Sequence, residues 1–494
     1  MERYLLGIDI GTTGTKTLLL TENGRLIRRA YRAYPLMTKR VGYSEQNAED
    51  WWAAVRESVR EACRAPGSTE HIAAVALSVQ GGTVVPVDGC GNALRPAIVW
   101  NDQRCTEERE EFLREVGGPD DMYQTTGWML GNGMPVLAIR WLRKHEPEIF
   151  KKTAMFQTVP DYIAARMTGI AAVDLSNLGI NHLGNVRRGC YDSKLLDFAG
   201  ITEDRLPRIV RSGDVIGRLT KESAEDLGLH PDVVLVAGAH DQYAAAVGAG
   251  AIQNGDTLIG SGTSWVVMAI GDAPAFESGL AQSVSAVPGK WGSLSSLSSG
   301  GVCLDWLRQN VCCGEAGDKL TYERINAEAA TREAAREGLF FFPFTGCATR
   351  EKKFEKGAFV GLDLSHDRFH MARAVMEGVA FQIVWKMQSF HVCDRERGII
   401  MAGGAGKSRL WCQMVADIAG IPVRVPLVPD LACVGAAIIA GVGSGVFDGY
   451  EEGCRRMLVE DCRIMPDQKS HREFSALMQK YMHMAAKLGE GYEL

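Results

Sequence analysis

The 494-residue sequence lacks several features that mark large classes of protein. Its thirteen cysteines are scattered and none forms a C-x-x-C pair, so neither a zinc site nor a disulfide framework is indicated. No apolar stretch reaches the ~18 residues that a membrane span needs. The N-terminus also lacks a basic region followed by an apolar run and a cleavage site. These absences predict a cytoplasmic protein without a membrane segment.

An excess of positive charge is also missing. The chain has 54 Lys and Arg against 60 Asp and Glu, which gives a formal net charge of −6 at pH 7. There is therefore no electrostatic case for a nucleic acid or an anionic membrane as a partner. Any anionic ligand must be held by local groups of the chain.

What the chain does have is a globular composition, with 46% hydrophobic and 23% charged residues. Its length is too great for one ordinary hydrophobic core. Strands and helices are mixed in two halves, and each half opens with a hairpin around a small polar loop. We therefore predict an α/β protein of two related domains, 1–245 and 246–494, with the active site in the cleft between them.

The first hairpin occupies Tyr4 to Leu20. Two apolar runs flank a loop, residues 11–16, that offers backbone amides, hydroxyl groups and one cation, which is the chemistry of a phosphate cradle. Asp9 lies in the first strand among apolar neighbours, where a carboxylate needs a partner such as hydrated Mg²⁺. The alternative is an ordinary Gly/Thr hairpin with a satisfied Asp. The glycine spacing does not match a dinucleotide fingerprint.

Two further glycine segments lie in the second half. Residues 256–270 repeat the pattern of strand, Gly/Ser/Thr loop and strand. Residues 403–408 are tempting as a P-loop, but that pattern needs glycine at the position of Met401. A glycine turn between a strand and a helix can instead pack against an adenine face, where any side chain would collide.

Polar residues that follow strand ends are candidates for ligand contact. Asn101 and Asp102 follow a short strand, and Asp241 follows an apolar strand and precedes a helix of small residues. Asp241 is the best candidate for a general base, because a carboxylate can accept a proton from a hydroxyl within ~3 Å. The alternative is that Asp241 merely caps that helix. His240 is expected to be a packed or hydrogen-bonding residue rather than a base.

Taken in order, these loops resemble those of the FGGY carbohydrate kinases, members of the actin-like ATPase superfamily. The resemblance covers roughly residues 4–445. It rests on GIDIGTTGTK (7–16), GSGTS (260–264), GGAGKSRLWCQMVADIAG (403–420) and a long C-terminal signature from Gly357 to Glu377. The resemblance implies two actin-like (ribonuclease H-like) domains and a kinase that uses ATP and Mg²⁺ to phosphorylate a sugar.

The resemblance also implies roles for individual residues. Asp241 would deprotonate the sugar hydroxyl, and Asp9 would hold Mg²⁺ through water. The residues that face the ATP phosphates or border the nucleotide would be Thr12, Thr13, Lys16, Gly262, Thr263, Gly300 or Gly301, Gly403 and Gly404. The residues on the sugar side would be Gln80, Gly81, Gly82, Asn101, Asp102 and Gln242.

The sequence departs from the family around the sugar. Xylulose kinases, which share the WNDQR segment and look closest, carry Met-His where this chain has Gly81-Gly82, and glycerol kinases carry Arg-Glu. The Tyr that walls the glycerol pocket falls near Gly133, and a signature Lys is replaced by Ala138. We therefore expect a roomier pocket, suited to a larger or differently oriented sugar than xylulose or glycerol.

The expected activity is ATP-dependent phosphorylation of a ketose or polyol, with domain closure expelling water from the cleft. Glycerol, erythritol or a larger sugar are the alternative acceptors. A non-catalytic actin-like sensor of sugar or nucleotide is a rival hypothesis, against which the intact Asp9 and Asp241 argue. An actin-like ATPase acting on protein partners is another, and it fits poorly with the C-terminal signature. A small-molecule sugar is the expected partner, and a homodimer is allowed.

Overall fold

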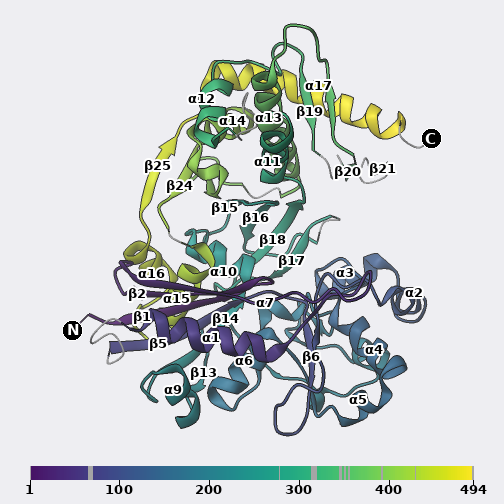
Figure 1. Ribbon diagram of the computed structural model, residues 1–494, viewed down its shortest axis with the longest axis vertical. Coiled ribbons are helices and arrows are strands. Elements are labelled where there is room, and N and C mark those ends of the chain that lie inside the picture. The colour runs from purple at the N-terminus through teal and green to yellow at the C-terminus, as the bar shows by residue number, and fades with distance from the viewer. Residues whose placement is uncertain are drawn as a thin grey trace. The chain divides into compact units, whose positions relative to one another are not determined.

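A computed structural model describes residues 2–64, 71–276, 279–312, 320–343, 348–349, 352–353, 356–390, 393–428 and 430–491. By its contacts the chain forms two compact units (Figure 1). The first unit comprises residues 1–253, 270–293 and 428–459, and the second comprises residues 254–269, 294–427 and 460–494. Two segments from the second half of the sequence thus pack with the first unit. The predicted division of the functional domains after residue 245, and the cleft between them, stay predictions.

The first unit is built on a six-stranded sheet in the order β13-β14-β5-β1-β2-β3. Strand β1 pairs antiparallel with β2, as the predicted hairpin requires, and parallel with β5, which in turn runs parallel to β14. The carboxyl ends of β1, β5 and β14 therefore meet at one edge of the sheet. The strands are β13 (Val215–Arg218), β14 (Val234–His240), β5 (Ile72–Val79), β1 (Tyr4–Ile10), β2 (Gly14–Thr21) and β3 (Leu26–Ala33).

Side chains of β1 alternate between two packed faces. Leu6, Ile8 and Ile10 join a buried core cluster with Trp51 of α1 (Ala48–Ala62). On the other face α15 (Leu431–Gly443) packs on β1 so closely that a Cβ atom at Gly7 would collide with the backbone carbonyl of Cys433. This close approach needs small residues and explains why a late segment of the chain belongs to the first unit.

Helix α15 also packs against α10 (Asp241–Gly248), again through small residues. A Cβ atom at Gly435 of α15 would collide with the carbonyl of Ala244, and one at Gly248 would collide with the carbonyl of Leu431. The small-residue helix that the sequence predicted after Asp241 is therefore a packing partner of α15. Figure 1 shows both helices beside β1 and β14.

The remaining strands and helices of the first unit surround this sheet and a second core cluster that includes Phe112, Leu137 and Phe156. The strands are β4 (Glu45–Gln46), β6 (Val84–Val87), β7 (Ala97–Ile98), β8 (Met155–Thr158), β9 (Ala172–Asp174), β10 (Gly184–Asn185), β11 (Cys190–Tyr191), β12 (Arg208–Val210) and β17 (Ala281–Val284). The helices are α2 (Thr106–Glu115), α3 (Pro119–Thr126), α4 (Pro135–His145), α5 (Pro147–Lys152), α6 (Val159–Thr168), α7 (Leu175–Leu178), α8 (Ser193–Ala199), η2 (Glu203–Arg205), α9 (Lys221–Leu227) and α16 (Tyr450–Met457).

The second unit repeats the hairpin arrangement. Strand β15 pairs antiparallel with β16 and parallel with β23, as β1 pairs with β2 and β5. The sheet continues in the order β16-β15-β23-β24-β25. The strands of this region are β15 (Thr257–Ser261), β16 (Trp265–Gly271), β18 (Trp291–Leu297), β19 (Phe340–Phe342), β20 (Ala348–Thr349), β21 (Lys352–Lys353), β22 (Ala358–Val360), β23 (Ile399–Gly403), β24 (Val423–Pro426) and β25 (Glu460–Ile464).

The long helix α13 (Arg368–Met387) is buried along most of its length. It packs against α11 (Gly301–Asn310), α12 (Tyr322–Ala329) and α14 (Arg409–Ala419). The other helices of this unit are η3 (Gln388–Phe390), η4 (Ala405–Lys407) and α17 (Gln468–Gly491).

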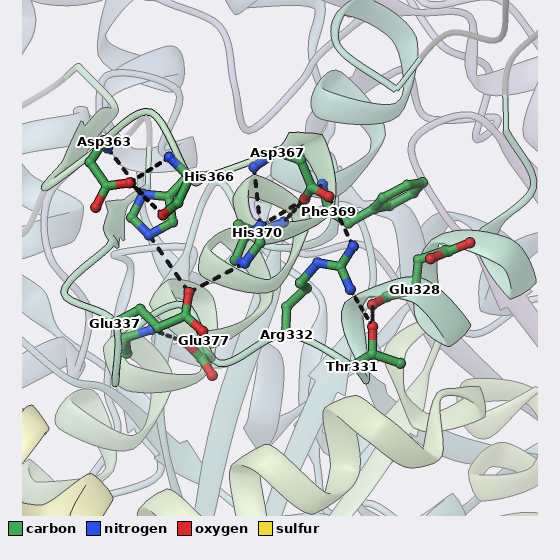
Figure 2. Close-up of polar contacts among 12 residues, drawn as sticks. Glu328, Thr331, Arg332, Glu337, Asp363, His366, Asp367, Phe369, His370 and Glu377 are labelled. Carbon is green, nitrogen blue, oxygen red and sulfur yellow. Dashed lines mark hydrogen bonds and ion pairs between the residues drawn. The ribbon is translucent and has the colours of Figure 1, made fainter.

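A polar cluster fixes the start of α13 (Figure 2). Asp367 accepts hydrogen bonds from the backbone amides of Phe369 and His370, both at 2.9 Å, and from Arg332 at 2.9 Å. Although burial acts to raise the pKa of Asp367, the bonds from Arg332 and His370 outweigh it and hold that pKa well below its usual range. Asp367 therefore caps the helix as a carboxylate.

Further along α13, Glu377 accepts hydrogen bonds from the Ala335 amide at 2.9 Å and from Arg373 at 2.6 Å. Arg373 and Glu377 belong to the long C-terminal signature that carries the family resemblance. Their contacts hold the segment before β19 against α13, so this part of the signature records how the unit packs.

Candidate active site

The carboxylate of Asp9 lies near the end of β1 and is 8% exposed. Its Oδ1 accepts a hydrogen bond from Ser78 on β5 at 2.8 Å, and its Oδ2 lies 3.5 Å from the Lys16 ammonium on β2. Burial and the nearby carboxylate of Asp430 raise the pKa of Asp9 to about 6, while Lys16 acts to lower it. Asp9 is thus a buried acid with too little positive charge around it. A bound cation would stabilise the ionised carboxylate in this environment.

Lys16 contacts two carboxylates. Its Nζ lies 3.0 Å from Asp430 and 3.5 Å from Asp9. Asp430 also caps α15, because it accepts a hydrogen bond from the Cys433 amide at 3.2 Å. Burial alone would lower the pKa of Lys16, but the two carboxylates raise it above its ordinary value. Lys16 is therefore a charged group that offsets the two acids.

Asp241 follows β14 and is the first residue of α10. The N-cap residue of this helix is His240 and Asp241 is the first helical residue, so the alternative that Asp241 is the capping residue is wrong. The Asp241 side chain is 34% exposed, and its Oδ1 is buried 3.1 Å from Nδ1 of His240. Asp241 also acts to raise the pKa of Asp9, so the two acids are neighbours at this sheet edge.

The first loop is tied to residues expected on the sugar side. Thr12 Oγ1 donates to Gln80 Oε1 at 3.0 Å and accepts from the Trp100 indole at 3.2 Å. Gln80 in turn donates to Gln46 at 2.8 Å, and Gln46 donates to the Thr12 carbonyl at 2.6 Å. Sequence reasoning missed Gln46, which no motif marks, and Trp100, although it lies in the WNDQR segment.

Asp102 has a different position from the one its place in the motif suggested. It is fully buried and accepts hydrogen bonds from the Ser44 amide at 2.6 Å and the Arg104 amide at 2.8 Å. The Arg104 guanidinium forms an ion pair with the same carboxylate, with 2.8 Å between its Nη2 and Oδ2 of Asp102. Both carboxylate oxygens are thus engaged within the protein, so these contacts support a structural role rather than the expected contact with sugar. Asn101 stays half-buried beside it.

The space at Gly81 and Gly133 is occupied, contrary to the expected roomier pocket. A Cβ atom at Gly81 would lie 2.5 Å from Cδ2 of His240, and one at Gly133 would collide with the carbonyl of Trp100. Gly82 has φ +67, and its Cβ would lie 3.1 Å from Cβ of Trp100. Side chains and backbone of the same unit therefore fill the room that missing side chains were expected to leave. Ala138 lies on α4 and is fully buried in the core.

The second unit contains a pocket of about 620 Å³ that four of the expected nucleotide residues line, namely Gly262, Thr263, Gly301 and Gly404. The lining also includes Tyr322 and Asn326, which sequence reasoning missed because they lie on a helix without a motif, and Trp411, which lies in the 403–420 segment but was not singled out. Among the described residues that line this pocket, none comes from the signature between Gly357 and Glu377.

Ser261 joins two of the glycine segments around this pocket. Its hydroxyl donates to the Ala402 carbonyl at 2.7 Å and accepts from the amides of Ala405 at 3.1 Å and Gly406 at 3.3 Å. Gly300 and Gly403 lie behind the lining, where a Cβ atom would meet Trp265 and the Ser261 backbone respectively. These two glycines permit close packing of the loops, whereas Gly301 and Gly404 face the pocket.

Metal ligands are sparse near Asp9. Within the described ranges, one group brings three potential ligand atoms together, and it consists of Glu107, Glu108 and His145. The Lys144 ammonium already lies 3.1 Å from Glu108 and balances that group. A cation at Asp9 would therefore take most of its ligands from water or substrate, as Mg²⁺ commonly does. No helix in the described part of the chain is long and apolar enough to cross a membrane.

The N-terminal domain of the FGGY family of carbohydrate kinases matches residues 4–248, and the C-terminal domain of that family matches residues 258–444. The chain belongs to the FGGY family of carbohydrate kinases. FGGY kinases are phosphotransferases that use ATP, so a sugar is the implied substrate of this one. The predicted fold class, an α/β protein of two actin-like domains, is confirmed as the two-domain α/β fold of the FGGY kinases.

Individual relatives of this FGGY kinase have different sugars in their names. A xylulose kinase of Bacillus subtilis is 28% identical over 495 residues, which cover 98% of this chain and 96% of that one. A gluconokinase of the same organism is also 28% identical and covers 100% of this chain and 97% of its own. The crystal structure of xylulose kinase from Rhodospirillum rubrum superposes with a TM-score of 0.90 at 27% identity, over 100% of both chains.

Proposed function

We propose that this FGGY kinase transfers the γ-phosphoryl group of ATP to a hydroxyl of a ketose or polyol, with Asp241 as the general base. The observation that carries this proposal is the Asp241 carboxylate itself. One of its oxygens is buried beside His240, yet the side chain remains 34% exposed at the edge where β1, β5 and β14 end. A fixed carboxylate that is open on one side can accept a proton from a bound hydroxyl.

The environment of Asp9 supports a role in holding Mg²⁺. The carboxylate is buried, near a second acid, and carries a raised pKa, so a divalent cation would relieve its desolvation. Bound Mg²⁺ would neutralise charge on the transferring phosphoryl group. Asp9 would hold the ion through water, and Ser78 fixes the carboxylate that does so.

Phosphate contacts are assigned to both hairpins. Thr12, Thr13 and Lys16 of the first hairpin would face the phosphates, together with Gly262 and Thr263 of the second. Lys16 would have to give up part of its contact with Asp430 to reach a phosphate. The pocket that Gly301 and Gly404 line has the volume and mixed lining that suit a nucleoside.

The sugar itself is proposed only as a class. Gln80, Gln242 and Asn101 are the polar groups assigned to it, with Gly81 and Gly82 beside them. A xylulose-like ketose is our first choice because of the WNDQR segment, and gluconate, glycerol, erythritol and larger sugars are the alternatives. Cytoplasmic location, closure over the substrates and a homodimer stay predictions.

Release of ADP measured against a panel of ketoses, polyols and aldonic acids tests this proposal. We expect one sugar class to stimulate ADP release strongly, and we expect chelation of Mg²⁺ to stop it. ADP release that no member of the panel stimulates above the rate with water alone would contradict the proposal.

A further inference from the structure

His240 is the last residue of β14 and is held on several sides. Its backbone amide donates to Ser176 Oγ at 2.8 Å. Its ring packs against Trp128, with 5.6 Å between ring centroids, and edge-on to Tyr243 at 5.8 Å. The side chain is 6% exposed. Packing on this scale restricts the imidazole to one position.

Gly81 gives the imidazole its space. A Cβ atom at this position would lie 2.5 Å from Cδ2 and 2.9 Å from Nε2 of His240. Any side chain at position 81 would therefore push the ring away from its present site. Gly81 follows the end of β5, and His240 is the last residue of β14. The two residues form a complementary pair, because the absence of a side chain at Gly81 leaves room for the imidazole.

The Nδ1 atom of His240 has two neighbours with opposite requirements. The Gln242 amide lies 3.3 Å away and can only donate, whereas Oδ1 of Asp241 lies 3.1 Å away and accepts when ionised. Oδ1 is buried and, within the described part of the chain, has no hydrogen-bond partner, because its contact with Nδ1 of His240 is an ion pair. A buried carboxylate oxygen without a donor is costly, and a charge-assisted bond is the stronger of the two choices. A proton on Nδ1 would give Oδ1 the donor that it lacks, in exchange for the bond in which the Gln242 amide donates to Nδ1.

We infer that His240 is a positioning residue for the reaction, which rests on the proposed role of Asp241 as general base. The Nδ1–H group of His240 donates to Oδ1 of Asp241 and fixes the carboxylate. Oδ2 then accepts the proton of the sugar hydroxyl while the hydroxyl oxygen bonds to the γ-phosphorus and the bond from that phosphorus to ADP breaks. Gly81 is part of this device because it leaves the ring its place.

Two matched substitutions separate the Nδ1 contact from general packing. His240→Asn keeps an amide group near the position of Nδ1, whereas His240→Gln places its amide nearer to Nε2. We expect His240→Asn to keep kcat within about threefold, and His240→Gln to lower kcat by about 10-fold to 100-fold, because misplacement of a reacting group has effects of that size. KM for ATP should change little in either variant. Equal losses in both variants would contradict a specific role for Nδ1.

The complementarity of Gly81 and His240 gives a second kinetic test. Gly81→Ala alone should lower kcat about 10-fold by displacing the ring. In a His240→Asn background, whose shorter side chain leaves room for the added methyl group, the same change should have a much smaller effect. Equal effects of Gly81→Ala in the two backgrounds would overturn the complementary pair.

The direct experiment is long-range ¹H–¹⁵N correlation on full-length protein labelled with ¹⁵N-histidine. His240→Gln identifies the His240 signals by their loss. We expect a proton on Nδ1 in the wild-type protein and its transfer toward Nε2 in Asp241→Asn. A neutral ring with its proton on Nε2 in the wild-type protein would overturn the inference, because Nδ1 would then accept from Gln242. If no sugar in the panel stimulated ADP release, the proposed function would be overturned instead. The position of the His240 proton could still be measured in that case.

Discussion

The two glycine-loop hairpins have the same strand arrangement but different chemistry. In each, the first strand pairs antiparallel with the second and parallel with a third strand, as β1 does with β2 and β5 and as β15 does with β16 and β23. The first hairpin carries Asp9 and Lys16 opposite each other across its two strands. The second hairpin carries only small polar residues in its loop. The shared topology positions a loop, and the side chains decide what that loop can do.

The difference reflects what each hairpin must satisfy. The buried charge of Asp9 requires Ser78 and Lys16 around it, which is a costly arrangement that a functional site can justify. The second hairpin needs only the hydroxyl of Ser261 to join it to the turn after β23. From this comparison we propose that the first hairpin neutralises charge and that the second recognises the shape of the nucleotide.

Among the substitutions that test the difference between the two hairpins, Asp9→Asn should lower activity the most. It removes the buried charge proposed to hold Mg²⁺ but keeps the size of the side chain. We expect kcat to fall by roughly 10²–10³-fold. Affinity for nucleotide without metal should stay close to that of the wild-type protein in a calorimetric titration. A variant with kcat near the wild-type value would show that the first hairpin does not carry the charge chemistry.

Gly301→Ala should affect the second hairpin and leave the first unchanged. Its Cβ atom would lie 2.5 Å from the Gly262 carbonyl oxygen, so the loop beside the pocket must shift. We expect nucleotide affinity to fall about tenfold, a loss of ~1.4 kcal/mol. Gly260→Ala is the matched control, because its nearest contact would be 3.8 Å away. Equal nucleotide affinities in the two variants would argue against shape recognition by this loop.

The smallest expected effect is on stability and concerns the charge of Asp9 in metal-free protein. Its pKa is about 6 in the folded protein against 3.8 as the ordinary value. The folded state therefore binds more protons than the unfolded state between about pH 4 and 6. The free energy of unfolding that the protonated Asp9 contributes at low pH is lost as pH rises through this window.

Asp9→Asn removes this dependence. Relative to the wild-type protein, the variant should gain about 1–3 kcal/mol in free energy of unfolding as pH rises from 4 to 7. Denaturant unfolding in the presence of a chelator measures the difference. A difference that stays constant across this range, or that favours the wild-type protein at pH 7, would contradict the raised pKa.

Sequence reasoning located the elements whose signals are local. The two hairpins are visible as apolar runs around polar loops, and Asp241 is visible as an acid after an apolar strand. The docking of α15 on β1 was not foreseen, because Gly7 and Cys433 are brought together only by packing across the whole chain. The same reason applies to the contact of Asp102 with the Ser44 amide, which lies far away in the sequence.

The most instructive error concerns the missing side chains at Gly81 and Gly133. A glycine in a sequence shows that a side chain is absent, but it does not show that space is present. Here His240 and the Trp100 backbone fill that space. The neighbours that occupy it come from other strands, so a single segment of sequence does not reveal them.

The most direct test of the account is Asp241→Asn, compared with the wild-type protein and with Asp192→Asn, which alters an aspartate that caps α8 in the same unit. With the sugar that best stimulates ADP release, we expect Asp241→Asn to lower kcat by about 10²–10⁴-fold. Its nucleotide affinity should match that of the wild-type protein, and Asp192→Asn should retain activity. Turnover by Asp241→Asn at the wild-type rate would contradict the assignment of the general base.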